Sequence, residues 1–330
     1  MAQDKIISLW SAVLMGLGGM IGAGIFVLLG EAGAVAGSAV WLSFLIAGLI
    51  ALLTGYSYGK FGARYPSAGG VVEFLTQGYG VGVVSGSASV LYYLAQVISI
   101  SMLAVSFGTY AAPLLFGSDP SQATGAILGS GVLVAITLVN FVGSKTVTKV
   151  ETIVVAINII ILMVFTVPAL TQVESDLIAP STYPSDRLIV SSLALTFFAF
   201  TGFGVIANTA EDIKDPKKNL PRAMMLSIGI VMALYVAIAV AVYGTLPVEK
   251  VLAAKSTALA VAAEPILGHA GFVLVSLSAM LAAASAINAN LYGTTKQTYL
   301  MAKDGELPQG FGRRMWKQGT EGLAITALLA

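Results

Sequence analysis

The chain is a succession of long apolar runs. Eight of them have 18 or more residues, which is long enough for a helix to cross the hydrocarbon core of a bilayer, about 30 Å thick. They lie at about residues 7–30, 39–59, 84–114, 124–143, 150–170, 188–208, 224–246 and 271–300, and a ninth begins near Gly322. Hydrophobic residues make up 57% of the chain and charged residues only 10%. The runs predict an all-α protein that crosses a membrane many times.

Lysine and arginine are distributed unevenly among the connections between these runs. With the N-terminus in the cytoplasm, three of them, Arg187, Lys250 and Lys255, fall on the outer side and fourteen on the inner side. The fourteen are Lys5, Lys60, Arg64, Lys145, Lys149, Lys214, Lys217, Lys218, Arg222, Lys296, Lys303, Arg313, Arg314 and Lys317. Cytoplasmic loops are enriched in these residues. The asymmetry predicts a multi-pass protein of the cell membrane with a cytoplasmic N-terminus.

Two of the apolar runs are interrupted by glycine. The first carries GGMIGAGIF at residues 18–26, and the sixth carries FFAFTGFG at residues 197–204. Glycine costs a helix interior about 1 kcal/mol, and lipid offers no partner for backbone groups that a break exposes. Matching breaks in two halves of a membrane protein indicate a transporter whose binding site lies at the interrupted helices. Close packing of small residues is the alternative explanation.

Four motifs resemble those of the amino acid/polyamine/organocation (APC) transporters and occur in the order of that family. They are MIGAGIF at 20–26, YPSAGG at 65–70, FFAFTGF at 197–203 followed by EDIKDPKKNLPR at 211–222, and MAKDGELP at 301–308. The resemblance is strongest to the prokaryotic, broad-specificity, proton-coupled amino acid transporters. It implies the LeuT-type fold, an inverted repeat of five plus five helices in which helices one and six are broken.

On that fold the whole chain, residues 1–330, is a single transport domain. Helices one to five, at about 7–170, form the first repeat. Helices six to eight and the start of helix nine, at about 188–330, form part of the second. The family has further helices, so the resemblance implies a repeat truncated at Ala330, and a reading frame that continues past Ala330 is expected to support transport.

An amino acid brings a carboxylate and an ammonium group, and backbone groups at the two breaks are suited to both. The carboxylate is expected at the N–H groups of Ala23, Gly24 and Ile25, aided by the positive end of a half-helix. The ammonium is expected at carbonyls freed by the breaks, at Ile21, Phe198, Ala199 and Thr201. Neither task needs a charged side chain, and the centres of these runs carry none.

The resemblance assigns further side chains to the pocket. Phe198 is expected to lie over the substrate as a gate, with Phe203 close by, although either could be ordinary packing. Tyr92 and Gln96 lie on one face of the third span, four residues apart, and match pocket positions. Asn290 matches another, or serves interhelical hydrogen bonding. Neutral amides favour a neutral substrate side chain, and the sequence predicts a secondary transporter of neutral L-amino acids that works by alternating access.

Energy coupling is where the chain departs from the family. Many members have a lysine midway along helix five whose protonation couples transport to the proton gradient, and Asn158 stands there instead. A buried lysine titrates near neutrality, whereas an amide does not titrate. A sodium site would use carbonyls of helix one and two adjacent hydroxyls on helix eight, and at that point of helix eight Ser285 has Ala284 beside it. The coupling ion, H⁺ or Na⁺, stays open, as do symport, exchange and facilitated transport, and Asn158 could instead be structural.

Other classes of protein fit the composition poorly. One histidine, no cysteine and no intramembrane carboxylate argue against an enzyme, a metal site or a disulfide, and no cofactor is expected. The spans lack the charged rings of a channel. Amino acids and membrane lipid are the expected partners, nucleic acid is not, and the oligomeric state is not indicated. A cationic amino acid or polyamine transporter, and a non-transporting sensor with this fold, are the alternatives.

Overall fold

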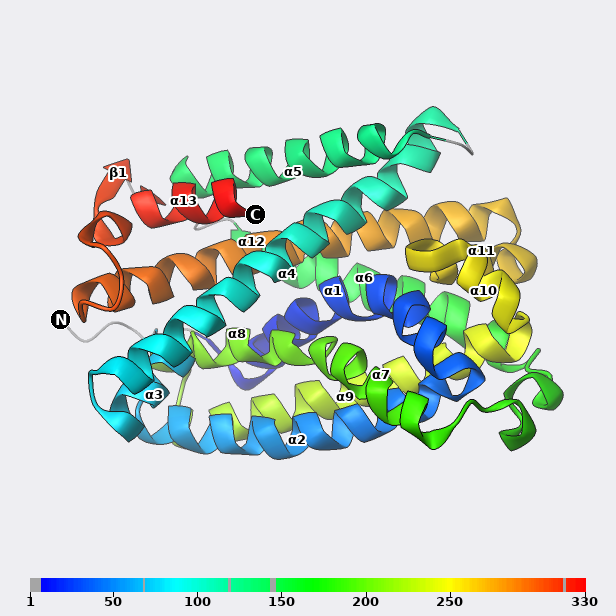
Figure 1. Cartoon of the computed structure of the whole chain (residues 1–330), viewed down its shortest axis with the longest axis horizontal. Helices are drawn as coiled ribbons and strands as arrows, with labels where there is room; N and C mark the ends of the chain where they lie inside the picture. Colours follow the sequence, from blue (N-terminus) through cyan, green and yellow to red (C-terminus); the bar gives the residue numbers. More distant parts are fainter. Residues whose placement is uncertain (1–6, 68, 118–119, 143–146, 317–318) are drawn as a thin grey trace.

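The computed structural model describes residues 7–67, 69–117, 120–142, 147–316 and 319–330. Long helices run roughly side by side along the longest dimension of the molecule (Figure 1). They are α1 (Leu9–Ala36), α2 (Val40–Arg64), α4 (Val83–Phe116), α5 (Gln122–Val142), α6 (Val147–Leu170), α9 (Pro216–Thr245) and α12 (His269–Lys303). An interrupted helix, α7 (Asp186–Phe198) followed by the 3₁₀ turn η4 (Thr201–Phe203) and α8 (Gly204–Ala207), completes the set.

These helices confirm the spans that the sequence predicts. Seven stretches among the described residues are long and apolar enough to cross a membrane. The first, Gly24–Arg64, joins α1 to α2 through a turn at Gly37, whose φ of 54° favours glycine. This first stretch contains parts of two separate helices, α1 and α2, so the seven stretches correspond to eight crossing segments. α9 begins at Pro216, earlier than predicted, because proline suits the first turn of a helix, where its missing N–H has no intrahelical partner.

Short elements lie at the two ends of the bundle. α10 (Val248–Ala254) and α11 (Ala258–Leu267) follow α9 in the sequence and lie at one end of the bundle (Figure 1). α3 (Val71–Tyr79), which the sequence analysis did not predict, lies at the opposite end (Figure 1). Two short antiparallel strands, β1 (Arg314–Trp316) and β2 (Gly319–Thr320), precede α13 (Glu321–Leu329), the start of the ninth run.

The predicted interruption of the sixth run is present, but the predicted break in the first run is not. α1 continues as a helix from Leu9 to Ala36. Its glycines serve close packing instead. A Cβ atom on Gly22 would collide with the Cβ of Ala286, and one on Gly19 would lie 2.7 Å from the carbonyl oxygen of Gly202. Packing that close compensates for the low helix propensity of glycine, so the helix is retained.

Three tyrosine hydroxyls from neighbouring helices donate hydrogen bonds to carbonyl oxygens of α1. The Tyr235 hydroxyl reaches Met20 at 2.7 Å, and the Tyr110 hydroxyl reaches Phe26 at 2.9 Å. The third, from Tyr243, is longer, 3.4 Å to Leu29. All three tyrosine side chains are buried. α1, which lies in the middle of the bundle (Figure 1), is therefore tied to α4 and α9 by polar contacts as well as by packing.

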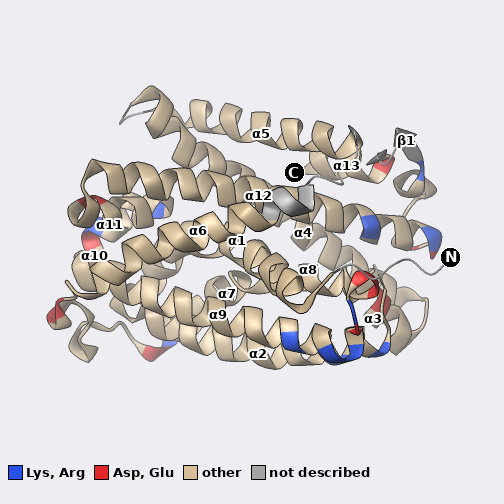
Figure 2. Cartoon of the chain, turned by 180° about the vertical axis from the view of Figure 1, so that it is seen from behind, with Lys and Arg blue, Asp and Glu red and all other residues tan. Residues whose placement is uncertain are grey.

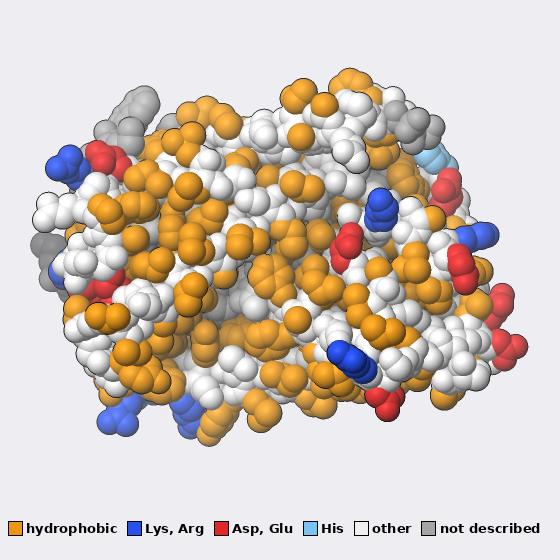
Figure 3. All heavy atoms as spheres, in the orientation of Figure 1, with side chains coloured by type: hydrophobic (Ala, Val, Ile, Leu, Met, Phe, Trp, Pro, Cys, Tyr) orange, Lys and Arg blue, Asp and Glu red, His pale blue; other side chains and the backbone are white. Residues whose placement is uncertain are grey.

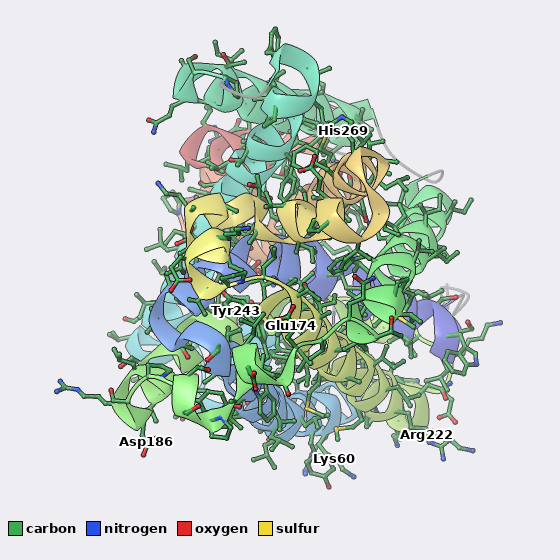
Figure 4. All side chains as sticks on the ribbon, turned by 90° about the vertical axis from the view of Figure 1, so that its right-hand side faces the viewer. Lys60, Glu174, Asp186, Arg222, Tyr243 and His269 are labelled. Carbon is green, nitrogen blue, oxygen red and sulfur yellow. The ribbon has the colours of Figure 1, made fainter. Side chains whose placement is uncertain are left out.

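Among the described residues, charged side chains lie mainly toward the two ends of the bundle (Figures 2 and 3). Lysine and arginine gather where α2 and α12 finish and α9 begins (Figure 2), and we name this the basic end. Figure 4 views the bundle from the opposite end, where Asp186 and His269 lie at the rim and Tyr243 lies inside. Between the ends the surface is mainly apolar (Figure 3). Lys5, Ala68, Lys145 and Lys317 lie outside the described residues.

The contact between Gly24 and Tyr235 gives a test of the packing of α1. A Cβ on Gly24 would collide with the Tyr235 hydroxyl oxygen. We expect Gly24→Ala to lower the free energy of unfolding by about 1–3 kcal/mol, the usual cost of overpacking. Tyr235→Phe in the same chain should restore part of the loss, because it removes that oxygen. Thermal unfolding of the protein purified in detergent measures both effects.

The matched control for this test is Gly131→Ala in α5, where a Cβ meets no atom within 4 Å. Both substitutions gain the same helix propensity, so their difference isolates the collision. If the Gly24→Ala protein proves as stable as the Gly131→Ala protein, α1 does not pack against Tyr235 in this way.

Candidate functional site

A cavity of about 260 Å³ lies at the middle of the bundle, between α4, α12 and the interrupted helix. Figure 3 shows the surface hollowed over the region between α4 and α8. α1 contributes Gly19 to the cavity wall, and α2 contributes Tyr58. The interrupted helix therefore lines a space whose wall carries polar side chains, and such a space is where a broken helix can be tolerated in a membrane.

Six of the residues predicted to bind substrate line this cavity. They are Tyr92 and Gln96 from α4, Phe198 and Ala199 from the end of α7, Thr201 from η4, and Asn290 from α12. They come from parts of the sequence that are far apart, and the fold brings them to one space. Their role in binding stays a prediction.

Hydrogen bonds hold the interrupted helix in place. The Ser192 hydroxyl donates to the Ser43 oxygen at 2.7 Å, and the Ser43 and Thr196 hydroxyls lie 2.8 Å apart, which fixes α7 on α2. At the break, the Thr201 hydroxyl donates to the Phe198 carbonyl at 2.8 Å. That carbonyl oxygen, like any other, has a second lone pair. The carbonyl expected to receive a substrate ammonium is therefore partly satisfied and can accept one further bond.

The other predicted residues lie off the cavity. Ile25 is fully buried, and Ile21 lines a separate small pocket. Gly24 is covered by Tyr235 and by the Ala199 carbonyl. The helix around Ala23, whose side chain lies outside the described part, is unbroken. The site predicted for the carboxylate is thus closed in this conformation, because the first run is not interrupted.

Phe203 also lies off the cavity. It is buried, and its ring packs edge-on against the ring of Tyr58, with centroids 5.3 Å apart. Tyr58 itself lines the cavity. Phe203 therefore supports the cavity wall from behind, and its gating role stays a prediction.

Five polar residues of the cavity wall were missed by the sequence analysis. They are Tyr58, Ser99, Asn208, Thr294 and Gln297. The Gln297 side-chain Nε2 donates to Asn208 Oδ1 at 3.2 Å, which links α12 to the end of α8. The last two of the five follow Asn290 at helical spacing on one face of α12. That spacing is the signal from which they could have been found.

A second pocket, too small to hold a water molecule in this conformation, lies between the two residues predicted to serve ion coupling. Asn158 of α6 and Ser285 of α12 line it together with Gly18, Ile21 and Gly22 of α1. Asn158 is buried, and its Oδ1 accepts a hydrogen bond from the Ser278 hydroxyl at 3.0 Å. The Ser285 hydroxyl is buried without a partner among the described residues. The same residues contain no cluster of three acidic, histidine or cysteine side chains that could hold a metal.

An interrupted helix beside α1, lining a polar cavity at mid-depth, is the arrangement of a secondary transporter of the LeuT type. A solved structure of a Na⁺-coupled sialic acid symporter, substrate-bound and outward-open, has the same fold. Its TM-score to this chain is 0.62 at 14% identity, covering 98% of this chain and 70% of the symporter. This comparison confirms the predicted fold class.

Sequence comparison gives the family. The amino acid permease family matches residues 7–330. The inner membrane transport protein YbaT of Escherichia coli is 36% identical over 326 residues, which are 99% of this chain and 76% of YbaT. An uncharacterised protein of Methanocaldococcus jannaschii is 40% identical over 329 residues, 99% of this chain and 75% of the relative. The chain belongs to the amino acid permease family, and it is a membrane transport protein rather than an enzyme.

Cysteine labelling can test the cavity directly, because the chain contains no cysteine. We expect Gln96→Cys and Thr201→Cys to react with a water-soluble maleimide in proteoliposomes, since both positions line the cavity. Ile25→Cys, at a fully buried position off the cavity, is the control and should stay unlabelled. Equal labelling at all three positions would mean that α1 opens to water where the structure closes it.

Proposed function

We propose that the protein is a secondary transporter of neutral L-amino acids that works by alternating access. The observation that carries this proposal is the chemistry of the cavity wall. Its described residues include hydroxyls, amides, aromatic rings and glycines, and no charged side chain. An ionised side chain brought into such a space would lack a counter-charge and would be costly to bury. A zwitterion with a neutral side chain needs only polar backbone and side-chain partners.

The Tyr235 hydroxyl supports a role for α1 in binding the substrate carboxylate. In an α-helix the N–H of residue 24 bonds to the carbonyl of residue 20, and Tyr235 already donates to the Met20 carbonyl at 2.7 Å. If α1 opens at Gly24, the Met20 carbonyl keeps its hydrogen bond from the Tyr235 hydroxyl, and the Gly24 N–H becomes free to bind an anion. The closed helix and a binding-competent one are then the two states that alternating access requires.

The charge distribution supports an orientation in the membrane. The basic end of the bundle is the end that the positive-inside rule assigns to the cytoplasm. With that end inside, α1 starts in the cytoplasm, and α10 and α11 cover the outer side. The transporter would lie in the cell membrane, surrounded by lipid along the apolar surface that lies between the two ends.

Uptake into proteoliposomes tests the substrate class. Radiolabelled L-serine uptake should be inhibited by unlabelled neutral L-amino acids and much less by L-lysine, L-glutamate, spermidine or glucose. The physical reason is the absence of charge in the described cavity wall. Liposomes without protein provide the background. Inhibition confined to polyamines or sugars would rule out neutral amino acids as the substrates.

Coupling to protons is proposed to be weak in this chain. The Asn158 amide cannot change charge. Its side chain is buried and accepts a hydrogen bond from the Ser278 hydroxyl. Only a group that gains and loses a proton as the two states interconvert can link protonation to transport. In the second pocket the Ser285 hydroxyl has no partner within the part of the chain that the structure describes. Sodium coupling and exchange are therefore the alternatives.

We expect Asn158→Lys to introduce or steepen the dependence of uptake on an imposed proton gradient, and Asn158→Ala to leave the shallow dependence of the unsubstituted protein unchanged. Uptake is measured with the internal pH fixed and the external pH varied, with and without sodium. A steep proton dependence that survives Asn158→Ala would show that another residue titrates.

A further inference from the structure

The cavity is longer than the charged groups of an amino acid require. On α12 its lining extends from Ala289 to Gln297, and on α4 from Tyr92 to Ser99. These stretches cover eight and seven residue steps, or about 10–12 Å of helix at 1.5 Å per residue. The break in the interrupted helix lies at residues 199–203, so Asn208 and Gln297 mark the end that is directed toward the basic end. That end has space for a part of the substrate other than its ammonium and carboxylate.

The lining of this end contains hydrogen-bonding atoms without partners. Thr294 and Gln297 are each 1% exposed. Within the described part of the chain, the Thr294 hydroxyl and the Gln297 Oε1 have no hydrogen-bond partner. The Gln297 amide is held in place by its bond to Asn208, and the Tyr92 hydroxyl lies beside it. Buried polar atoms are nearly always paired, so two unpaired polar atoms on buried residues that line a cavity indicate a ligand or water that binds there.

From these atoms we infer that the end of the cavity formed by Asn208, Thr294 and Gln297 binds the substrate side chain, and selects neutral amino acids whose side chains carry an amide or a hydroxyl. The inference rests on the proposed function and specifies its substrate class. A side-chain N–H or O–H can donate to Gln297 Oε1, and the Thr294 hydroxyl can donate or accept.

An aliphatic side chain of the same shape would displace water and leave both atoms without partners. Leaving a buried polar group unpaired lowers affinity by roughly 5- to 100-fold. Sites built to bind a polar group discriminate strongly against apolar analogues for this reason. The preference should therefore appear between amino acids that match in shape and differ in polarity.

Two such pairs are L-asparagine against L-leucine and L-threonine against L-valine. We expect titration calorimetry on the purified full chain to show that the polar member of each pair binds at least about tenfold more tightly. This comparison needs no substitution, so it does not depend on whether a variant folds. If the apolar members bind as tightly as the polar ones, the inference is wrong and the proposed function stands. If none of the four binds, the proposed function fails as well.

Variants then test the named residues. Gln297→Met keeps the length of the side chain and removes its amide, and Thr294→Val keeps the shape and removes the hydroxyl. Each should weaken binding of the polar member of a pair about tenfold more than that of the apolar member. A uniform change for all four amino acids would assign these residues to packing or gating and overturn the inference.

Thr298→Val is the matched control. Thr298 is buried on the same helix, lies outside the cavity wall, and donates its hydroxyl to the Thr295 carbonyl at 3.1 Å. Its replacement removes the same atom as Thr294→Val, one turn further along α12, and should leave the ratio of affinities within each pair unchanged.

Discussion

Close contact between α1 and the helices around it is the constraint on which the rest of the bundle depends. In a bilayer the packing of helices cannot rely on the hydrophobic effect, so it uses small residues and polar contacts. α1 provides both. Its glycines admit Gly202 and Ala286, and its carbonyls accept the hydroxyls of Tyr235 and Tyr110. A helix with bulky side chains at these positions would push its neighbours apart, and both the cavity and the small pocket would lose a wall.

The same constraint explains why the first and sixth runs behave differently although both contain glycine. At Gly202 the interrupted helix approaches Gly19 backbone to backbone, so both positions need glycine. α1 stays helical because side chains from other helices pack onto most of its glycines, such as Tyr235 on Gly24 and Ala286 on Gly22. The interrupted helix faces the cavity at Thr201, an exposed residue, where polar space can satisfy backbone groups. A glycine run therefore permits a break, and the environment decides whether one forms.

Structural features that depend on the length and periodicity of apolar runs could be predicted from the sequence. Features that depend on which distant residue packs against a position could not. The spans followed from apolar runs, and the interruption at 199–203 from glycine beside aromatic residues. The break expected near Gly24 was wrong because no pattern reveals that Tyr235, more than 200 residues away, covers it. Thr294 and Gln297 were missed although they share a helical face with Asn290, because neither stands at a position that the resemblance to the family assigns to the pocket.

The two pockets share walls on α1 and on α12. Gly19 lines the larger cavity, and Gly18, Ile21 and Gly22 line the pocket of Asn158 and Ser285. Residues 18–22 span little more than one turn, so no rigid-body shift of this segment can change one pocket without changing the other. A coupling free energy between two sites needs an element that both sites bias, and this turn of α1, together with α12, is the structure that both pockets share.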